Sequence, residues 1–291
     1  MAWFSLEEFG DRQFNVTRRW LPAALSGADG IACLSQAEAL KLSRVEFGAH
    51  VHLLGCMEEF IAPPTITLVR GIPPDARGAF AVLSSAATDE VSHRGVFLEV
   101  RARVNDAIGF ALALLPETRR AANVVLGKRT GAVRLLTACL QSPAETHFLR
   151  CAQDHASLDP LARQILSAYW RDTARRARRS RLDTIRVFQA MAAADRDEAI
   201  EDFVELVIGL EALLHVQARF DVENLQRYIR RALTKAEQEE VLEALIAAKR
   251  QTFVGSGLSD PGFREMFSLV ATRDQRRRVE EALETPMETV A

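Results

Sequence analysis

An apolar helical stripe that contains an acid and an imidazole is the feature that most constrains the fold of this chain. At 100° per residue, the following side chains share one sector of a helix: Leu83, Ala86, Glu90, His93, Phe97, Val100 and Val104. The stretch is therefore predicted to be an amphipathic helix that turns Glu90 and His93 toward the core. Because buried polar groups need partners, other helices must supply them.

The composition favours an all-α protein. Hydrophobic residues make up 48% of the 291 residues, and only 15 are Gly and 10 are Pro. The net charge of −2 excludes a global field that would draw the chain to nucleic acid or to anionic lipid. No stretch approaches the ~20 apolar residues of a membrane span, and the N-terminus lacks a secretory pattern. We expect a cytoplasmic protein with no nucleic-acid or membrane partner.

The periodicity indicates three regions: a lead-in over 1–34, a bundle core over 35–195 and C-terminal helices over 196–291 packed on that core. The core helices are predicted at about 35–62, 76–104, 130–155 and 160–193. The C-terminal helices are predicted at about 196–219, 221–233, 235–253 and 273–284, with a loop over 255–262.

Punctuating residues set the expected helix ends. Ser35 and Glu38 have capping-box spacing at the start of the first helix, and Pro63-Pro64 is expected to stop that helix. Ser142-Pro143 should kink or break the third helix, and Asp159-Pro160 should begin the fourth.

The first core helix offers two adjacent acids that could meet Glu90. If the first two core helices are antiparallel about a turn near residue 74, then Glu58 or Glu59 lies level with Glu90. Glu59 is favoured, because it lies on a strip of small side chains that leaves room for a neighbour or an ion. The other reading is that both acids are solvated at the end of the helix.

Glu59 followed by Glu90-x-x-His93 resembles the first half of the site in the ferritin-like diiron-carboxylate superfamily, which includes ribonucleotide reductase small subunits, desaturases and N-oxygenases. The resemblance covers about 36–190. It implies an all-α fold, a ferritin-like four-helix bundle with additional C-terminal helices. It also implies that Glu59, Glu90 and His93 bind iron, as one or two ions.

The second half of the chain does not repeat this pattern. If the helical hairpin is duplicated, Gln141, Thr173 and Arg176 stand where Glu, Glu and His are expected. A shifted frame recruits Asp172, or Glu145 and His147, but restores no Glu-x-x-His. Six arginines lie within Arg171–Arg181. We therefore expect a degenerate site in which an inward guanidinium such as Arg176 replaces a metal cation. The alternative is that the arginines form a solvated face.

Two other polar spots lie on apolar helix faces. Glu211 shares a stripe with core residues and has His215 one turn on, so a chelating i, i+4 pair that completes a rearranged metal site is geometrically allowed. A hydrogen-bonded contact between helices is the commoner use of such a pair. His50 beside Glu46 is interpreted in the same way, whereas His147 and His155 show no spacing signal.

Two functions are carried forward. The first is a diiron-type oxidoreductase, an oxygenase or oxidase that activates O2 to oxidise a small organic substrate. The second is a metal-poor, degenerate protein that binds a ligand or partner without redox chemistry. Either function is compatible with a homodimer.

Overall fold

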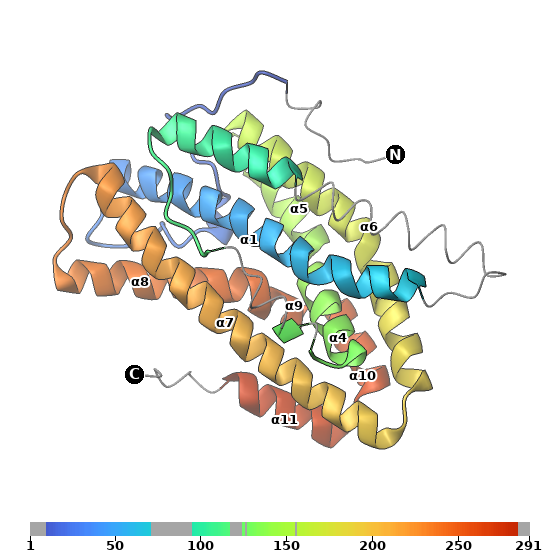
Figure 1. Cartoon of the computed structure of the whole chain (residues 1–291). Coiled ribbons are helices and arrows are strands. Elements are labelled where there is room, and N and C mark those ends of the chain that lie inside the picture. The colour runs from blue at the N-terminus through green and yellow to red at the C-terminus, as the bar shows by residue number, and fades with distance from the viewer. Residues whose placement is uncertain (1–9, 71–94, 117–123, 126, 155, 285–291) are drawn as a thin grey trace.

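The computed structural model describes residues 10–70, 95–116, 124–125, 127–154 and 156–284, with only the backbone described for 59–70 and 284. Apart from one isolated bridge between Arg19 and Leu158, the regular structure of these residues is helical (Figure 1). The prediction of an all-α protein is confirmed. No helix in the described part of the chain is long and apolar enough to cross a membrane.

Three long helices dominate the described structure. They are α1 (Gln36–Arg70), α6 (Pro160–Ala190) and α7 (Ala193–Ile229). Shorter helices are α4 (Thr130–Gln141), α5 (Ala144–Gln153), α8 (Lys235–Arg250), α9 (Ser256–Ser259), α10 (Pro261–Val270), α11 (Arg273–Glu284) and an unlabelled helix over 95–108. A short 3-10 helix covers Ala23–Leu25, and one π-helical segment covers Gln251–Gly255.

The helices pack around one main core. α7 lies along α1, α4 lies against both α6 and α7, and α5 and α10 lie against α6 (Figure 1). One buried cluster runs from Phe14 to Leu283 and includes residues of all three predicted regions. The predicted boundary at 195/196 falls inside the first turn of α7. The C-terminal region thus contributes to the same core as the predicted bundle.

Several predicted helix ends are confirmed. The Asp159 side chain accepts the Ala162 backbone N–H at 2.7 Å and caps α6. α4 ends at Gln141 and α5 begins at Ala144, so the break at Ser142-Pro143 is where the sequence placed it. The helix predicted at 273–284 corresponds to α11.

Three helix boundaries predicted from the sequence are wrong. α1 continues through Pro63-Pro64 to Arg70, because proline's fixed φ is compatible with a helical backbone even though each proline removes a hydrogen bond. The helices predicted at 196–219 and 221–233 are one helix, α7. Asp221 lies inside α7, where its carboxylate pairs with Lys249 of α8 at 2.6 Å.

The predicted loop over 255–262 is mostly helical. Gly255 ends the π-helical segment, and Gly257 lies in α9. A Cβ on Gly257 would lie 2.3 Å from the carbonyl oxygen of Cys139. Gly257 is therefore needed for the close approach of α9 to α4, and not for a turn.

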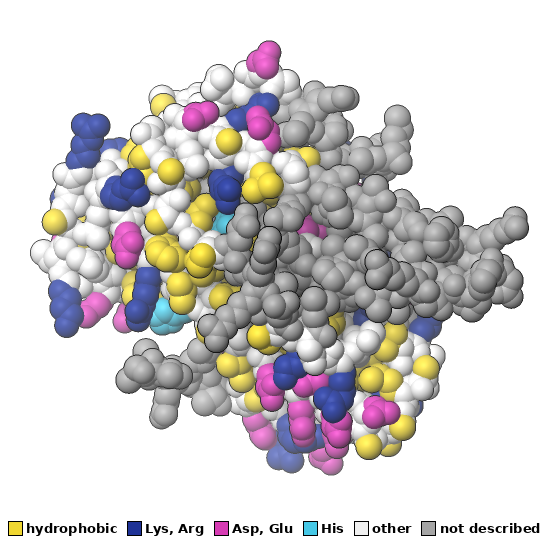
Figure 2. Space-filling view, in the orientation of Figure 1, with side chains coloured by type: hydrophobic (Ala, Val, Ile, Leu, Met, Phe, Trp, Pro, Cys, Tyr) yellow, Lys and Arg dark blue, Asp and Glu magenta, His cyan; other side chains and the backbone are white. Residues whose placement is uncertain are grey.

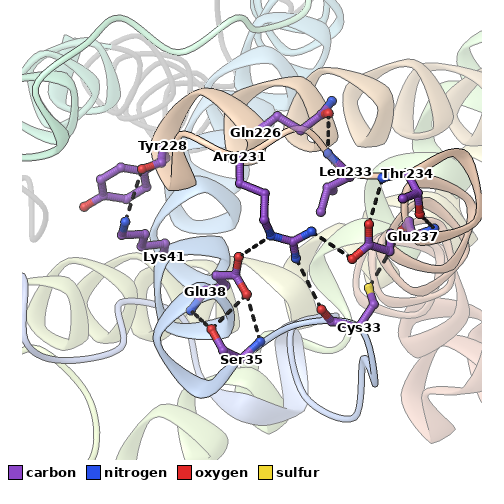
Figure 3. Close-up of polar contacts among 10 residues, drawn as sticks. All are labelled: Cys33, Ser35, Glu38, Lys41, Gln226, Tyr228, Arg231, Leu233, Thr234 and Glu237. Atoms are coloured by element: carbon purple, nitrogen blue, oxygen red, sulfur yellow. Dashed lines mark hydrogen bonds and ion pairs between the residues drawn. The ribbon is translucent and has the colours of Figure 1, made fainter.

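The corner between α7 and α8 is fixed by an arginine that also holds the start of α1 (Figure 3). Arg231 donates to the Glu38 and Glu237 carboxylates, each at 2.8 Å, and to the Cys33 carbonyl at 3.3 Å. Glu38 also accepts from the Ser35 N–H at 2.9 Å, which confirms the predicted capping box. Three chain segments are thereby joined at one guanidinium.

Candidate functional site

A buried ion pair joins α1 to α6. The Arg176 Nη2 lies 3.2 Å from the Glu58 Oε1, and the Arg176 Nε lies 3.4 Å from the Asp172 Oδ2. Only 1% of the Glu58 side chain and 15% of the Arg176 side chain are exposed. We call Glu58, Tyr169, Asp172, Thr173 and Arg176 the Arg176 cluster.

The spacing of the cluster on α6 explains its geometry. Tyr169, Asp172, Thr173 and Arg176 are three or four residues apart along one helix, so their side chains lie on one face. The Arg176 Nη2 also donates to the Thr173 Oγ1 at 3.4 Å. α1 brings Glu58 to this face, and one guanidinium therefore lies between two carboxylates.

The electrostatics keep the guanidinium charged. Burial lowers the pKa of Arg176, but the Glu58 carboxylate, Tyr169 and Asp172 outweigh burial and raise that pKa above its ordinary value. Burial, followed by the charge of Glu58, raises the pKa of the Tyr169 phenol, which stays protonated. The cluster thus contains a permanent cation and a neutral hydroxyl beside Glu58.

The structure places the favoured metal ligands only in part. Glu90 and His93 lie outside the described residues, as does His155, and the side chain of Glu59 is not described. The adjacent acid, Glu58, is the one whose side chain is seen in the core. Sequence reasoning had weighed Glu58 against Glu59 and favoured the latter.

The lower-ranked residues have different surroundings. Asp172 and Arg176 are together in the Arg176 cluster, as described above. Gln141 is 5% exposed at the end of α4, and its Oε1 has no hydrogen-bond partner among the described residues. Its neighbour Ser142 accepts from Arg181 of α6 at 3.2 Å.

The Glu211 carboxylate is engaged by an arginine. It accepts from the Arg250 Nε at 2.7 Å, which links α7 to α8. His215 is partly exposed, and its pKa is lowered by partial burial and by Arg219. The contact with Arg250 favours the hydrogen-bonded interpretation over a metal chelate.

Sequence reasoning missed a second buried cluster, formed by two imidazoles around an indole. The ring centroid of Trp170 lies 5.9 Å from that of His50 and 4.8 Å from that of His147. His50 also lies 5.0 Å from the Phe253 ring. Both imidazoles are at most 3% exposed. We call His50, His147 and Trp170 the imidazole cluster.

The imidazole cluster is uncharged. Burial, together with His147 and Lys249, lowers the pKa of His50 to about 3. Burial and Arg150 lower the pKa of His147 to about 4. The His50 Nε2, the His147 Nδ1 and the Trp170 Nε1 have no hydrogen-bond partners among the described residues. Such buried groups commonly hold ordered water.

The π-helical segment Gln251–Gly255 contacts the imidazole cluster. The Thr252 carbonyl lies 3.3 Å from the His147 Nε2 and accepts the Ser256 hydroxyl at 2.7 Å. π-helical turns often occur at functional sites. The sequence placed His50 on the core face of the first helix but associated it with Glu46, and His147 had no spacing signal.

The described residues do not fit the second half of a two-metal site. Arg176 occupies a position where the resemblance requires a ligand, and its guanidinium already neutralises Glu58. Among the residues in the described ranges, no group of three or more His, Cys, Asp or Glu could hold a metal ion. At the predicted ligand positions, α4 and α6 carry an amide, a hydroxyl, a carboxylate and a guanidinium.

Comparison with known proteins adds no relative. No family model matches the chain, and neither a curated protein nor a solved structure matches it.

Proposed function

We propose that this protein is a degenerate ferritin-like protein that binds a ligand or partner without two-metal redox chemistry. The observation that supports the proposal most strongly is the buried pair of Arg176 and Glu58. In the ferritin-like pattern, the helix that corresponds to α6 would supply side chains that bind a metal ion. Here an arginine side chain supplies the positive charge instead.

The charge balance explains why an arginine is stable in the place of a metal ion. Glu58 and Asp172 would repel each other in a buried site that had no cation, and their pKa values would rise. A guanidinium makes directional charge-assisted hydrogen bonds and stays charged at any physiological pH. Arg176 therefore compensates the negative charge of these acids, as a metal ion would. A metal ion would have to displace Arg176 to reach Glu58.

The competing function is the diiron-type oxidoreductase. It needs O2 to meet two ions with open coordination positions, and the ligands for the second ion would have to come from α4 and α6. Gln141, Thr173 and Arg176 do not provide the required carboxylates and imidazole. This function is retained as the outcome that would overturn the proposal.

The test is metal content of the whole chain purified from iron-supplemented cells, measured by inductively coupled plasma mass spectrometry. We expect the wild-type protein to hold fewer than two irons per chain. The Thr173→Glu/Arg176→His variant restores Glu-x-x-His on α6 and should gain iron. Arg175→Glu/Arg178→His is the matched control, because it places the same motif on exposed positions of α6.

Two irons in the wild-type chain would contradict the proposal and support the oxidoreductase. A folded Thr173→Glu/Arg176→His variant with no more iron than the control would contradict the assignment of 173 and 176 as the missing ligand positions. Circular dichroism should accompany each measurement, so that loss of fold is not mistaken for loss of metal.

A further inference from the structure

Two adjoining clefts lie between α10, α11 and the segment that follows α8. The larger cleft has a volume of about 680 Å³ and is lined by four arginines, Arg264, Arg273, Arg276 and Arg277. The smaller cleft has a volume of about 220 Å³. Arg264, Phe267 and Glu280 line both clefts, so the two are contiguous.

The smaller cleft has an apolar lining. Its walls include Val254, Leu258, Phe263, Val279 and Leu283. Phe263 and Phe267 stack with their ring centroids 5.7 Å apart, which gives the cleft a flat aromatic side. Four of the six apolar lining side chains are at most 5% exposed, so this wall belongs to the core and is well ordered by packing.

The larger cleft has an excess of positive charge. Its four arginines face two lining acids, Asp274 and Glu280, and Arg277 also pairs with Glu281 at 3.3 Å. No hydrogen bond or ion pair is made by the side chains of Arg273 and Arg276 to the described residues. Arg264 uses its Nε on the Leu258 carbonyl at 3.1 Å, which holds its guanidinium where the clefts join.

On the side of α11 that faces α7, by contrast, Arg278 is paired with acids. Arg278 contacts Asp197 at 2.6 Å and Glu201 at 3.4 Å, both on α7. Figure 2 shows basic and acidic side chains interspersed over this part of the surface. Arg278 is therefore engaged by α7, in contrast to Arg273 and Arg276 in the larger cleft.

We propose that the two clefts form one binding site for a single-chain amphiphile with an anionic head, an alkyl carboxylate or an alkyl phosphate. The apolar tail lies against Phe263 and Phe267, and the head is held by Arg273 and Arg276. Arginine is suited to both heads because its planar guanidinium makes two parallel hydrogen bonds to a carboxylate or a phosphate. None of these residues belongs to the Arg176 cluster, so the site does not depend on the proposed function.

Isothermal titration calorimetry of the full chain tests the site with four probes below their aggregation concentrations: decanoate, decyl phosphate, decanol and inorganic phosphate. We expect saturable binding of one decanoate or decyl phosphate per chain, and at least about tenfold weaker binding of decanol and of inorganic phosphate. The ratio between decanoate and decyl phosphate identifies the preferred head.

Three variants locate the binding. Arg273→Gln/Arg276→Gln should weaken the anionic amphiphile about tenfold or more but leave decanol unchanged. Leu258→Trp, at a half-buried position of the smaller cleft, should weaken binding by filling the space for the tail. Arg186→Gln is the control, because this arginine of α6 has a 76% exposed side chain and lines neither cleft.

Equal binding of decanol and decanoate would overturn the proposal, as would full affinity in the folded Arg273→Gln/Arg276→Gln variant. Binding of inorganic phosphate as tight as that of decyl phosphate would mean an adventitious ion only. Full affinity in the Leu258→Trp variant would show that the tail does not occupy the smaller cleft.

Discussion

The Arg176 cluster and the imidazole cluster are neighbours on α6, yet they solve the burial of polar groups in opposite ways. The first contains two carboxylates and compensates them with a guanidinium. The second contains two imidazoles with no acid in contact among the described residues, and it stays neutral because their pKa values are lowered to about 3 and about 4. Burial is tolerated in the first cluster by pairing and in the second by loss of charge.

The difference predicts different sensitivities. In the Arg176 cluster, removal of one partner leaves an uncompensated buried charge, whatever the pH near neutrality. In the imidazole cluster, the same penalty appears only when acid forces protons onto the rings. Mutation should therefore disturb the first cluster most, and pH the second.

The largest effect is expected from Arg176→Ala. It leaves Glu58 and Asp172 buried without their cation, and should lower the free energy of unfolding by about 3–5 kcal/mol in denaturant titration. The Glu58→Leu/Arg176→Met variant removes the buried pair itself and should stay within about 1 kcal/mol of the wild type. A loss below about 1 kcal/mol in Arg176→Ala would show that the pair is solvated.

Acid should destabilise the protein through the imidazole cluster. The folded-state pKa values of His50 and His147 lie below the ordinary value of 6.5, so the unfolded chain binds more protons below about pH 6.5. This contribution to stability is complete above about pH 6.5 and is lost as the pH falls toward 4 and 3. Between pH 7 and pH 5 each imidazole should lower the free energy of unfolding by about 2 kcal/mol.

The His50→Phe variant isolates this effect. Its free energy of unfolding should fall by about 2 kcal/mol less than that of the wild type between pH 7 and pH 5, since the carboxylates titrate in both proteins. Parallel pH profiles for the two proteins would show that folding does not lower the pKa of His50, and would erase the contrast between the clusters.

Removing one hydroxyl from the Arg176 cluster, or that of Ser256 beside the imidazole cluster, should give the smallest effects. Tyr169→Phe removes a hydroxyl that interacts with Glu58 and Thr173, and should lower the free energy of unfolding by about 1.5 kcal/mol because a charged group is involved. Ser256→Ala loses a neutral hydrogen bond to the Thr252 carbonyl and should lose about 0.5 kcal/mol. A larger loss in Ser256→Ala, measured by denaturant titration, would reverse the ranking.

Much of the secondary structure follows from local signals in the sequence. Asp159-Pro160, Ser142-Pro143 and the Ser35–Glu38 pair act within one turn of chain, and each end is where they predict it. The failures involve long-range contacts. Gly257 reads as a loop residue, but its lack of a side chain serves the packing of α9 on Cys139.

The candidate site was predictable only in part, because its geometry also depends on contacts between distant segments. The ligand spacing expected from a duplicated hairpin singled out Arg176 as an inward residue, and the structure pairs it with the buried Glu58. The helix-face pattern favoured Glu59 over Glu58, but neighbouring residues differ by only 100°, and which acid meets Arg176 depends on the position of α6. The imidazole cluster joins α1, α5 and α6, and no pattern within one segment predicts such a contact.

The most direct test of the central claim is metal rescue of the Arg176→Ala variant. If Arg176 takes the place of a cation, its removal should leave Glu58 and Asp172 able to accept one. Addition of Mn2+ or Co2+ should then raise the melting temperature of Arg176→Ala and leave that of the wild type unchanged. An equal rise in both proteins, or no rise in Arg176→Ala, would contradict the claim.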